Sequence, residues 1–179
     1  EWPQGAKMSA LAFRPDGKLL VVAGERGEDG HIEQFDPADG KPIRIVSRKG
    51  MRLLCAAFSP DGRSFAAGGS LSGGKAGPAI ALWDARGWKE KRLLAAPGSA
   101  EVVSVAFSAD GKLLASVTRG RDAVALWKPG SGKLREELSG LGLGESGAAA
   151  LDPGGRLLAV GGAGGVRLWP AESSSGKKL

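Results

Sequence analysis

The sequence predicts an all-β protein made of four repeats of four-stranded antiparallel sheets, the last of them incomplete. Two short motifs predict this class, because they recur in the same order at intervals of roughly 45 residues, as in a repeat architecture. The composition agrees with it. The chain has 30 glycines and 10 prolines among 179 residues, which supply many turns, and 42% hydrophobic residues, which can form a core.

The first motif is a tight turn between two apolar runs. It reads Phe-Arg-Pro-Asp-Gly at 13–17, Phe-Ser-Pro-Asp-Gly at 58–62, Phe-Ser-Ala-Asp-Gly at 107–111 and Leu-Asp-Pro-Gly-Gly at 151–155. Proline presets φ, aspartate can bond its own backbone, and glycine accepts a positive φ. Each copy therefore predicts a hairpin between the first and second strands of a sheet.

The run before each turn alternates large and small side chains, as in Val103, Val105 and Phe107 with Ser104 and Ala106 between them. A period of two indicates a strand. Since the small face is not polar, both faces are predicted to be buried between neighbouring sheets. Second strands are expected just after the turns, at 19–23, 65–68, 113–117 and 157–160.

The second motif predicts the third strands. It reads Ile-Glu-Gln-Phe-Asp at 32–36, Ile-Ala-Leu-Trp-Asp at 80–84, Val-Ala-Leu-Trp-Lys at 124–128 and Val-Arg-Leu-Trp-Pro at 166–170. The tryptophans that recur in register are predicted to lie in the core: Trp83, Trp127 and Trp169. Trp88 falls outside this register, in a turn, and an exposed Trp88 would be a candidate contact residue.

A fourth, more polar strand is expected at 42–46, 91–95 and 133–138, where charge protects an outer edge. The stretch 133–138 also suits a short helix, although the register favours a strand. After the last copy the chain continues as a polar tail over 171–179, so the last repeat is expected to lack its fourth strand.

Four strands per roughly 45 residues make the blade of a β-propeller. The Pro-Asp-Gly turns and Leu82-Trp83-Asp84 resemble the WD40 family in its bacterial form, with blades at 6–47, 50–96, 101–139 and 145–170 inside a segment spanning 1–170. The family's Gly-His pair is absent, and its aspartate before the tryptophan is kept only as Asp29. We therefore expect the polar network of such blades to be missing.

The resemblance implies rings of more than four blades. It therefore predicts an open arc that exposes blade faces at both ends, or closure by self-association through those faces, as in an eight-bladed dimer. It also implies a protein–protein interaction scaffold that forms the WD40-repeat part of a larger protein. The alternatives are a propeller-fold enzyme fragment, lactonase-like or cofactor-binding, whose site lies outside or across this segment, and a purely structural spacer.

Partners are expected to be other proteins. The loops on one face carry basic residues that would attract an acidic partner if they cluster. The candidate contact residues are Arg48, Lys49, Arg52, Lys75, Trp88, Arg119 and Arg121. The net charge of +6 is scattered along the chain, so no nucleic acid is expected. No stretch approaches the roughly 20 apolar residues that membrane insertion requires.

No catalytic, cofactor-binding or metal-binding residues are predicted, and the chain is expected not to be an enzyme. His31 is the single histidine and Cys55 the single cysteine, which leaves too few groups for a histidine triad or a zinc site. The segment 69–75 begins like a P-loop, but Ala76 stands where a Ser or Thr is needed. The acidic stretch 25–39 lacks the residue order of a calcium loop. These features leave the cellular compartment open, with the cytoplasm favoured.

Overall fold

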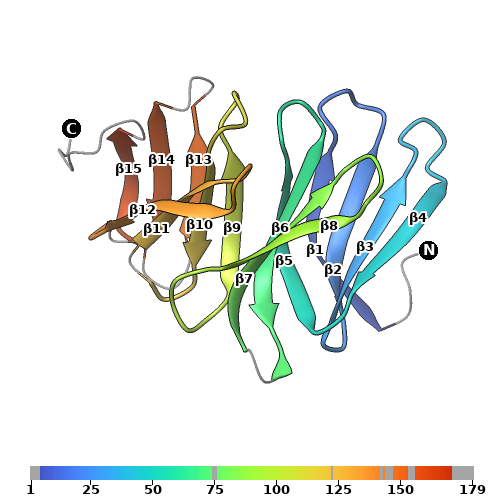
Figure 1. Cartoon of the computed structure of the whole chain (residues 1–179), viewed down its shortest axis with the longest axis horizontal. Helices are drawn as coiled ribbons and strands as arrows, with labels where there is room; N and C mark the ends of the chain where they lie inside the picture. Colours follow the sequence, from blue (N-terminus) through green and yellow to red (C-terminus); the bar gives the residue numbers. More distant parts are fainter. Residues whose placement is uncertain are drawn as a thin grey trace.

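The computed structural model describes residues 5–73, 76–121, 123–141, 143, 147–152 and 156–170. These residues form fifteen strands in four separate antiparallel sheets, which fan out side by side (Figure 1). The predicted all-β fold of propeller blades is therefore confirmed. Among the same residues, no helix is long and apolar enough to cross a membrane.

Each blade keeps its strands in chain order, and each strand pairs with the next. Blade 1 contains β1 (Ala6–Phe13), β2 (Leu20–Arg26), β3 (Asp29–Phe35) and β4 (Pro42–Arg48). Blade 2 contains β5 (Met51–Phe58), β6 (Ser64–Leu71), β7 (Gly77–Asp84) and β8 (Glu90–Ala95). Blade 3 contains β9 (Val102–Phe107), β10 (Leu114–Thr118), β11 (Ala123–Lys128) and β12 (Lys133–Ser139). Blade 4 contains β13 (Gly147–Leu151), β14 (Leu157–Gly162) and β15 (Gly165–Pro170).

The blades stack face to face. The first strands β1, β5, β9 and β13 contact one another in turn, and β4, β8 and β12 lie outermost. One buried apolar cluster fills each gap between consecutive blades. Blades 1 and 4 stand at opposite ends of the stack, so the sheets form an open arc, as predicted (Figure 1). We call the side of a blade that points to the preceding blade its front, and the other side its back.

The hairpins between first and second strands owe their shape to the repeated aspartate. In blade 2 the Asp61 carboxylate accepts hydrogen bonds from the Ser59 hydroxyl at 2.6 Å and from the Arg63 N–H at 3.0 Å. Gly62 follows with a φ of 66°. The same arrangement surrounds Asp16 and Asp110, so the motif builds one turn three times.

The third-strand tryptophans are buried, as predicted for Trp83, Trp127 and Trp169. Each lies on the front of its blade and packs in the cluster shared with the blade before it. One hydrogen bond links such an indole to its own blade, from Trp127 Nε1 to the Ser116 hydroxyl at 2.9 Å. The other tryptophans depend on apolar packing at the corresponding positions, where β6 has Ala67 and β14 has Val160.

Two expectations about the outer strands are met. The stretch that also suited a helix is strand β12, paired along its length with β11. Blade 4 has three strands among the described residues, as expected for an incomplete last repeat. The predicted tail at 171–179 lies outside the described residues.

Candidate functional site

The basic residues singled out in the sequence follow two kinds of loop, those between second and third strands and those that connect one blade to the next. The structure brings two of them together: Arg52, the second residue of β5, and Arg119, which follows β10. Both arginines reach Glu101, which precedes β9: Arg52 forms an ion pair with it, and Arg119 Nη2 lies 3.5 Å from Glu101 Oε2. Glu25 approaches Arg52 Nε at 3.7 Å, so this cluster contains as many carboxylates as guanidinium groups.

The other candidate arginines do not join that cluster. Arg48 Nε lies 3.0 Å from Glu90 Oε2 in β8, and Arg121 pairs with Glu137 in β12. Each of these arginines therefore has an acidic partner, and these surfaces carry mixed charge. Such half-exposed ion pairs stabilise a fold by about 0–1 kcal/mol each.

Lys49 and Lys75 complete the predicted set of basic residues. Lys49 is exposed between β4 and β5, and within the described part of the chain it forms no ion pair. Lys75 lies outside the described residues.

Trp88 does not meet the condition for a contact residue, an exposed side chain. Its side chain is only 8% exposed and packs edge-on against Phe58 and tilted against Phe65. Trp88 lies four residues after Asp84 and has a φ of 56°, in a turn where blade 1 has Gly40 and blade 3 has Gly132. Because its backbone directs the indole into the cluster between blades 1 and 2, Trp88 belongs to the core.

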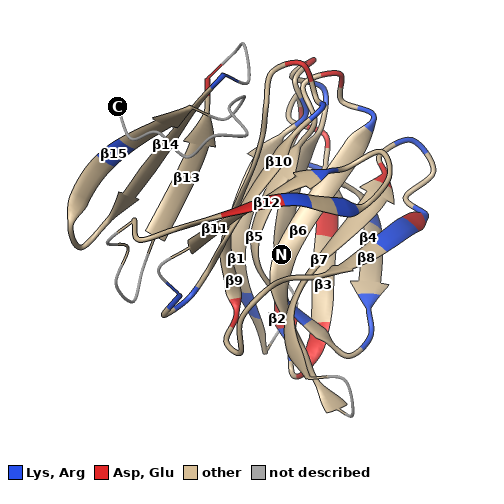
Figure 2. Cartoon of the chain, turned by 60° about the vertical axis from the view of Figure 1, so that its left-hand side comes forward, with Lys and Arg blue, Asp and Glu red and all other residues tan. Residues whose placement is uncertain are grey.

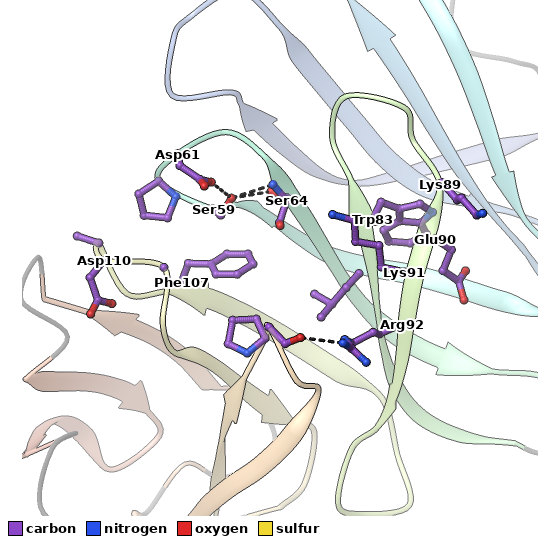
Figure 3. A pocket seen from close by; sticks show the side chains of 16 residues that line it. Ser59, Asp61, Ser64, Trp83, Lys89, Glu90, Lys91, Arg92, Phe107 and Asp110 are labelled. Carbon is purple, nitrogen blue, oxygen red and sulfur yellow. Dashed lines mark hydrogen bonds between the residues drawn. The ribbon is translucent and has the colours of Figure 1, made fainter.

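A groove that the sequence reading missed lies between blades 2 and 3, beside the aspartate turns (Figure 3). It has a volume of about 780 Å³. Leu82 of β7 and Phe107 of β9 provide apolar surface, and the turns that hold Asp61 and Asp110 form one wall.

The opposite wall of the groove is the outer strand β8 and the turn before it. It carries Lys89, Lys91 and Arg92, and Figure 3 shows them across the groove from Asp61 and Asp110. Arg92 donates a hydrogen bond to the Gly130 carbonyl of blade 3 at 2.8 Å, and Lys91 pairs with Asp84 at 3.1 Å. Lys89 is exposed at the mouth. The sequence feature that pointed to this wall is the run of charged residues at the start of β8, which the sequence alone explains equally well as protection of an outer sheet edge.

The aspartates of the groove are already engaged in their own turns. The Ser59 hydroxyl and the Arg63 N–H hold the pKa of Asp61 below its usual value. The Lys112 N–H, followed by the Ser108 hydroxyl, lowers the pKa of Asp110 in the same way. Both carboxylates therefore stay ionised at neutral pH, and their hydrogen-bonding capacity is largely used within the chain.

The residues weighed for catalysis do not converge. His31 is buried within β3, where loss of hydration lowers its pKa, and its Nε2 lies 4.0 Å from Glu33 Oε2. Cys55 lies in β5, where burial raises the pKa of its thiol to about 12. The start of the P-loop-like segment belongs to strand β6, and Lys75 is outside the described residues. No group of three metal-binding side chains occurs among the residues described above.

Two segments of the chain match the model of a known protein family. Residues 4–36 and 88–125 match the family model described as WD domain, G-beta repeat. Two segments of the chain therefore resemble WD40 repeats. The first match ends with β3 of blade 1, whereas the second begins just before β8 of blade 2 and ends within β11 of blade 3. The WD40 unit of sequence is thus offset by one strand from the blade.

A curated relative matches the chain over a limited length. The chain is 35% identical over 77 residues to the Intraflagellar transport protein 122 homolog of Danio rerio. The match covers 42% of this chain and 6% of that protein, so it relates the chain to a small part of the relative.

Proposed function

We propose that this chain is the WD40-repeat part of a protein-interaction scaffold. The observation that carries the proposal is the match of two segments to the WD40 repeat in a chain whose blades present loops along both rims. The relative named above, an intraflagellar transport protein, is similar to the chain over a small part of its length. The likeness to bacterial members of the family stays a prediction.

The alternative of a propeller-fold enzyme fragment has no specific observation in its favour. Among the described residues, His31 and Cys55 lie in different blades, and neither lines the groove between blades 2 and 3. The scaffold therefore remains the function that this geometry supports best.

The proposed contact site is the groove, and the proposed partner segment is acidic with apolar side chains. Lys89 and Arg92, which form no ion pair among the described residues, offer positive charge at β8 and the turn before it, next to the apolar surface of Phe107, whereas Lys91 is paired with Asp84. The arginines predicted from the sequence support this role less well, because Arg48, Arg52, Arg119 and Arg121 are each paired with a glutamate. Lys49 keeps its place as a proposed second contact.

Fluorescence anisotropy with a labelled decapeptide of glutamate and leucine tests this proposal. The double variant Lys89→Glu with Arg92→Glu should weaken binding by about tenfold, because both charges that face the acidic segment reverse. The matched control is Lys18→Glu with Lys41→Glu, which makes the same charge change in exposed turns of blade 1 and should leave binding unaltered.

A third double variant, Arg119→Glu with Arg121→Glu, separates the two candidate surfaces. If it weakens peptide binding while the groove variant does not, the contact lies with the residues predicted from the sequence. If no variant changes the affinity, neither surface is the contact.

A further inference from the structure

A second depression lies next to the groove, on the other side of blade 2. This hollow has a volume of about 550 Å³ and lies between the aspartate turns of blades 1 and 2. Pro60 and Asp61 line both the groove and the hollow. The aspartate turn of blade 2 therefore forms a ridge between two neighbouring depressions on the same rim of the stack.

Three arginines line the hollow, and they differ in how firmly each is paired. Arg14 is held by Asp16 of its own turn, with Nη2 2.8 Å from Oδ2 and Nε 2.9 Å from Oδ1. Arg63 Nε lies 4.0 Å from Asp61 Oδ2, and its side chain is 68% exposed. Arg86 is exposed and forms no ion pair within the part of the chain that the structure describes. Two guanidinium groups of the hollow therefore lack a close acidic partner.

The walls of the hollow are held by contacts that do not involve these two guanidinium groups. The Ala85 N–H donates to the Arg63 carbonyl at 2.9 Å, so the two turns of blade 2 lie side by side. A Cβ on Gly62 would lie 3.1 Å from Arg14 Cγ, so the turn of blade 1 packs closely on the turn of blade 2. The side chains of Arg63 and Arg86 can therefore be replaced without loss of the contacts that shape the hollow.

The turn between β7 and β8 supplies a basic side chain to each depression. Arg86 lines the hollow, and Lys89, three residues later, lines the groove. Positive charge therefore continues from the groove across blade 2 toward blade 1. On the opposite side of the groove, beyond blade 3, strands β13 and β14 carry no charged side chain (Figure 2). An acidic segment that leaves the groove toward blade 1 would meet further cations.

We propose that the partner segment bound in the groove continues over Pro60 into the hollow, where Arg63 and Arg86 bind a second group of carboxylates. This inference rests on the proposed function of the groove and specifies its partner, an acidic segment with two groups of carboxylates joined by a few residues. Guanidinium groups suit such a partner, because their N–H donors match the two oxygens of a carboxylate. Pro60 is exposed on the ridge and has no N–H that the crossing segment would leave without an acceptor.

Fluorescence anisotropy with peptides of two lengths tests this inference on the full chain. The short peptide is the glutamate and leucine decapeptide that tests the groove. The long peptides add a glycine–serine spacer of three, six or nine residues and then three glutamates, at either end in separate peptides. One long peptide should bind about tenfold more tightly than the short one, and the gain should be largest when the spacer matches the width of the ridge, because the second group then binds within the same complex. Control peptides that end in three glutamines should bind like the short one.

The double variant Arg63→Glu with Arg86→Glu assigns the gain to the hollow. It should remove the tenfold advantage of the long peptide and leave the affinity for the short peptide unaltered. The matched control is Lys7→Glu with Arg26→Glu, which makes the same charge change at the far ends of β1 and β2 and should keep the advantage. All four of these side chains are exposed, so circular dichroism should show a folded β protein for both variants.

The two peptide lengths separate failure of this inference from failure of the proposed groove. If the short peptide binds but no long peptide binds more tightly, the hollow is not part of the site and the groove stands. A gain that the glutamine peptides share, or that the arginine variant keeps, would also overturn the role of the hollow. If the short peptide does not bind at all, the groove and the hollow are both excluded as the contact.

Discussion

At the scale of single residues, Trp88 satisfies two opposing demands. Its φ of 56° lies in the left-handed region, where a bulky side chain is strained by about 1–2 kcal/mol. Its indole nevertheless fills space beside Phe58 and Phe65, and loss of such a side chain costs about 3–5 kcal/mol. Packing exceeds strain, which explains why a tryptophan stands where the equivalent turns have glycine.

Two substitutions separate these contributions. Trp88→Ala should lower the free energy of unfolding by about 3–5 kcal/mol, because it removes the packing and keeps the strained backbone. Trp88→Gly removes the same packing but relieves the strain, so it should be more stable than the alanine variant by about 1 kcal/mol. Urea unfolding measures both values. An alanine variant as stable as the glycine variant would show that φ imposes no penalty here.

Cys55 gives a second prediction for a single residue. Burial raises the pKa of its thiol to about 12, so almost no thiolate is present at pH 8. Ellman's reagent should therefore react slowly with the native chain and rapidly in denaturant, and the two rates are measured by absorbance. A fast native reaction would place the thiol at the surface.

At the scale of strands and turns, the Pro-Asp-Gly hairpins should make stability depend on pH. Asp16, Asp61 and Asp110 all have a pKa lowered by local hydrogen bonds, led by the Arg14 side chain, the Ser59 hydroxyl and the Lys112 N–H respectively. A carboxylate whose pKa is lower in the folded state stabilises the fold above its unfolded pKa, near 3.9, and loses that effect as pH falls through the folded pKa. Tm should therefore decrease as pH falls from about 6 to about 3.

The matched variant replaces all three aspartates by asparagine, which keeps an oxygen acceptor and cannot titrate. Thermal melts followed by circular dichroism should then show a smaller loss of Tm over the same range. If the slope is unchanged, other carboxylates cause the acid sensitivity.

Close approach between blades gives another prediction at this scale. A Cβ on Gly68 of β6 would lie 2.5 Å from Val102 Cγ1 of β9 and 2.8 Å from Cys55 Sγ. Gly68→Ala should therefore lower the free energy of unfolding by about 1–3 kcal/mol, since side chains on both blades must move. Gly87→Ala is the control, because no atom within 4 Å would meet its Cβ. Denaturant melts compare the two, and equal stabilities would mean that the interface adapts freely.

The features that the sequence predicted correctly are those that depend on short-range interactions along the chain. Strands and aspartate turns depend on neighbours within a few residues, so the alternation around Phe107 and the turn around Asp110 were readable from the chain. The core role of Trp127 was readable because the motif repeats. The ion pair of Arg52 with Glu101 joins residues far apart in the sequence and depends on how two blades stack.

The features of the candidate site that the sequence did not predict depend on long-range contacts. Trp88 has no counterpart in the other repeats, so the repeat pattern did not predict where its ring lies. Its backbone conformation directs the ring into the core. The groove wall at Lys89 and Arg92 becomes a site only where blade 3 lies opposite. Both features depend on contacts between blades that no single repeat encodes.

At the scale of the whole molecule, the offset between the WD40 unit and the blade has a consequence for how such chains change length. The match over 88–125 contains β8 of one blade, β9 and β10 of the next, and the first half of β11. If the segment from β8 to the end of β11 is deleted, β12 follows β7 and can take the place of β8, so the remaining sheet still has four strands. A duplication works in reverse and inserts a complete blade without leaving an orphan strand. Propellers of this kind can therefore gain or lose blades by simple genetic events, each of which preserves every sheet it touches.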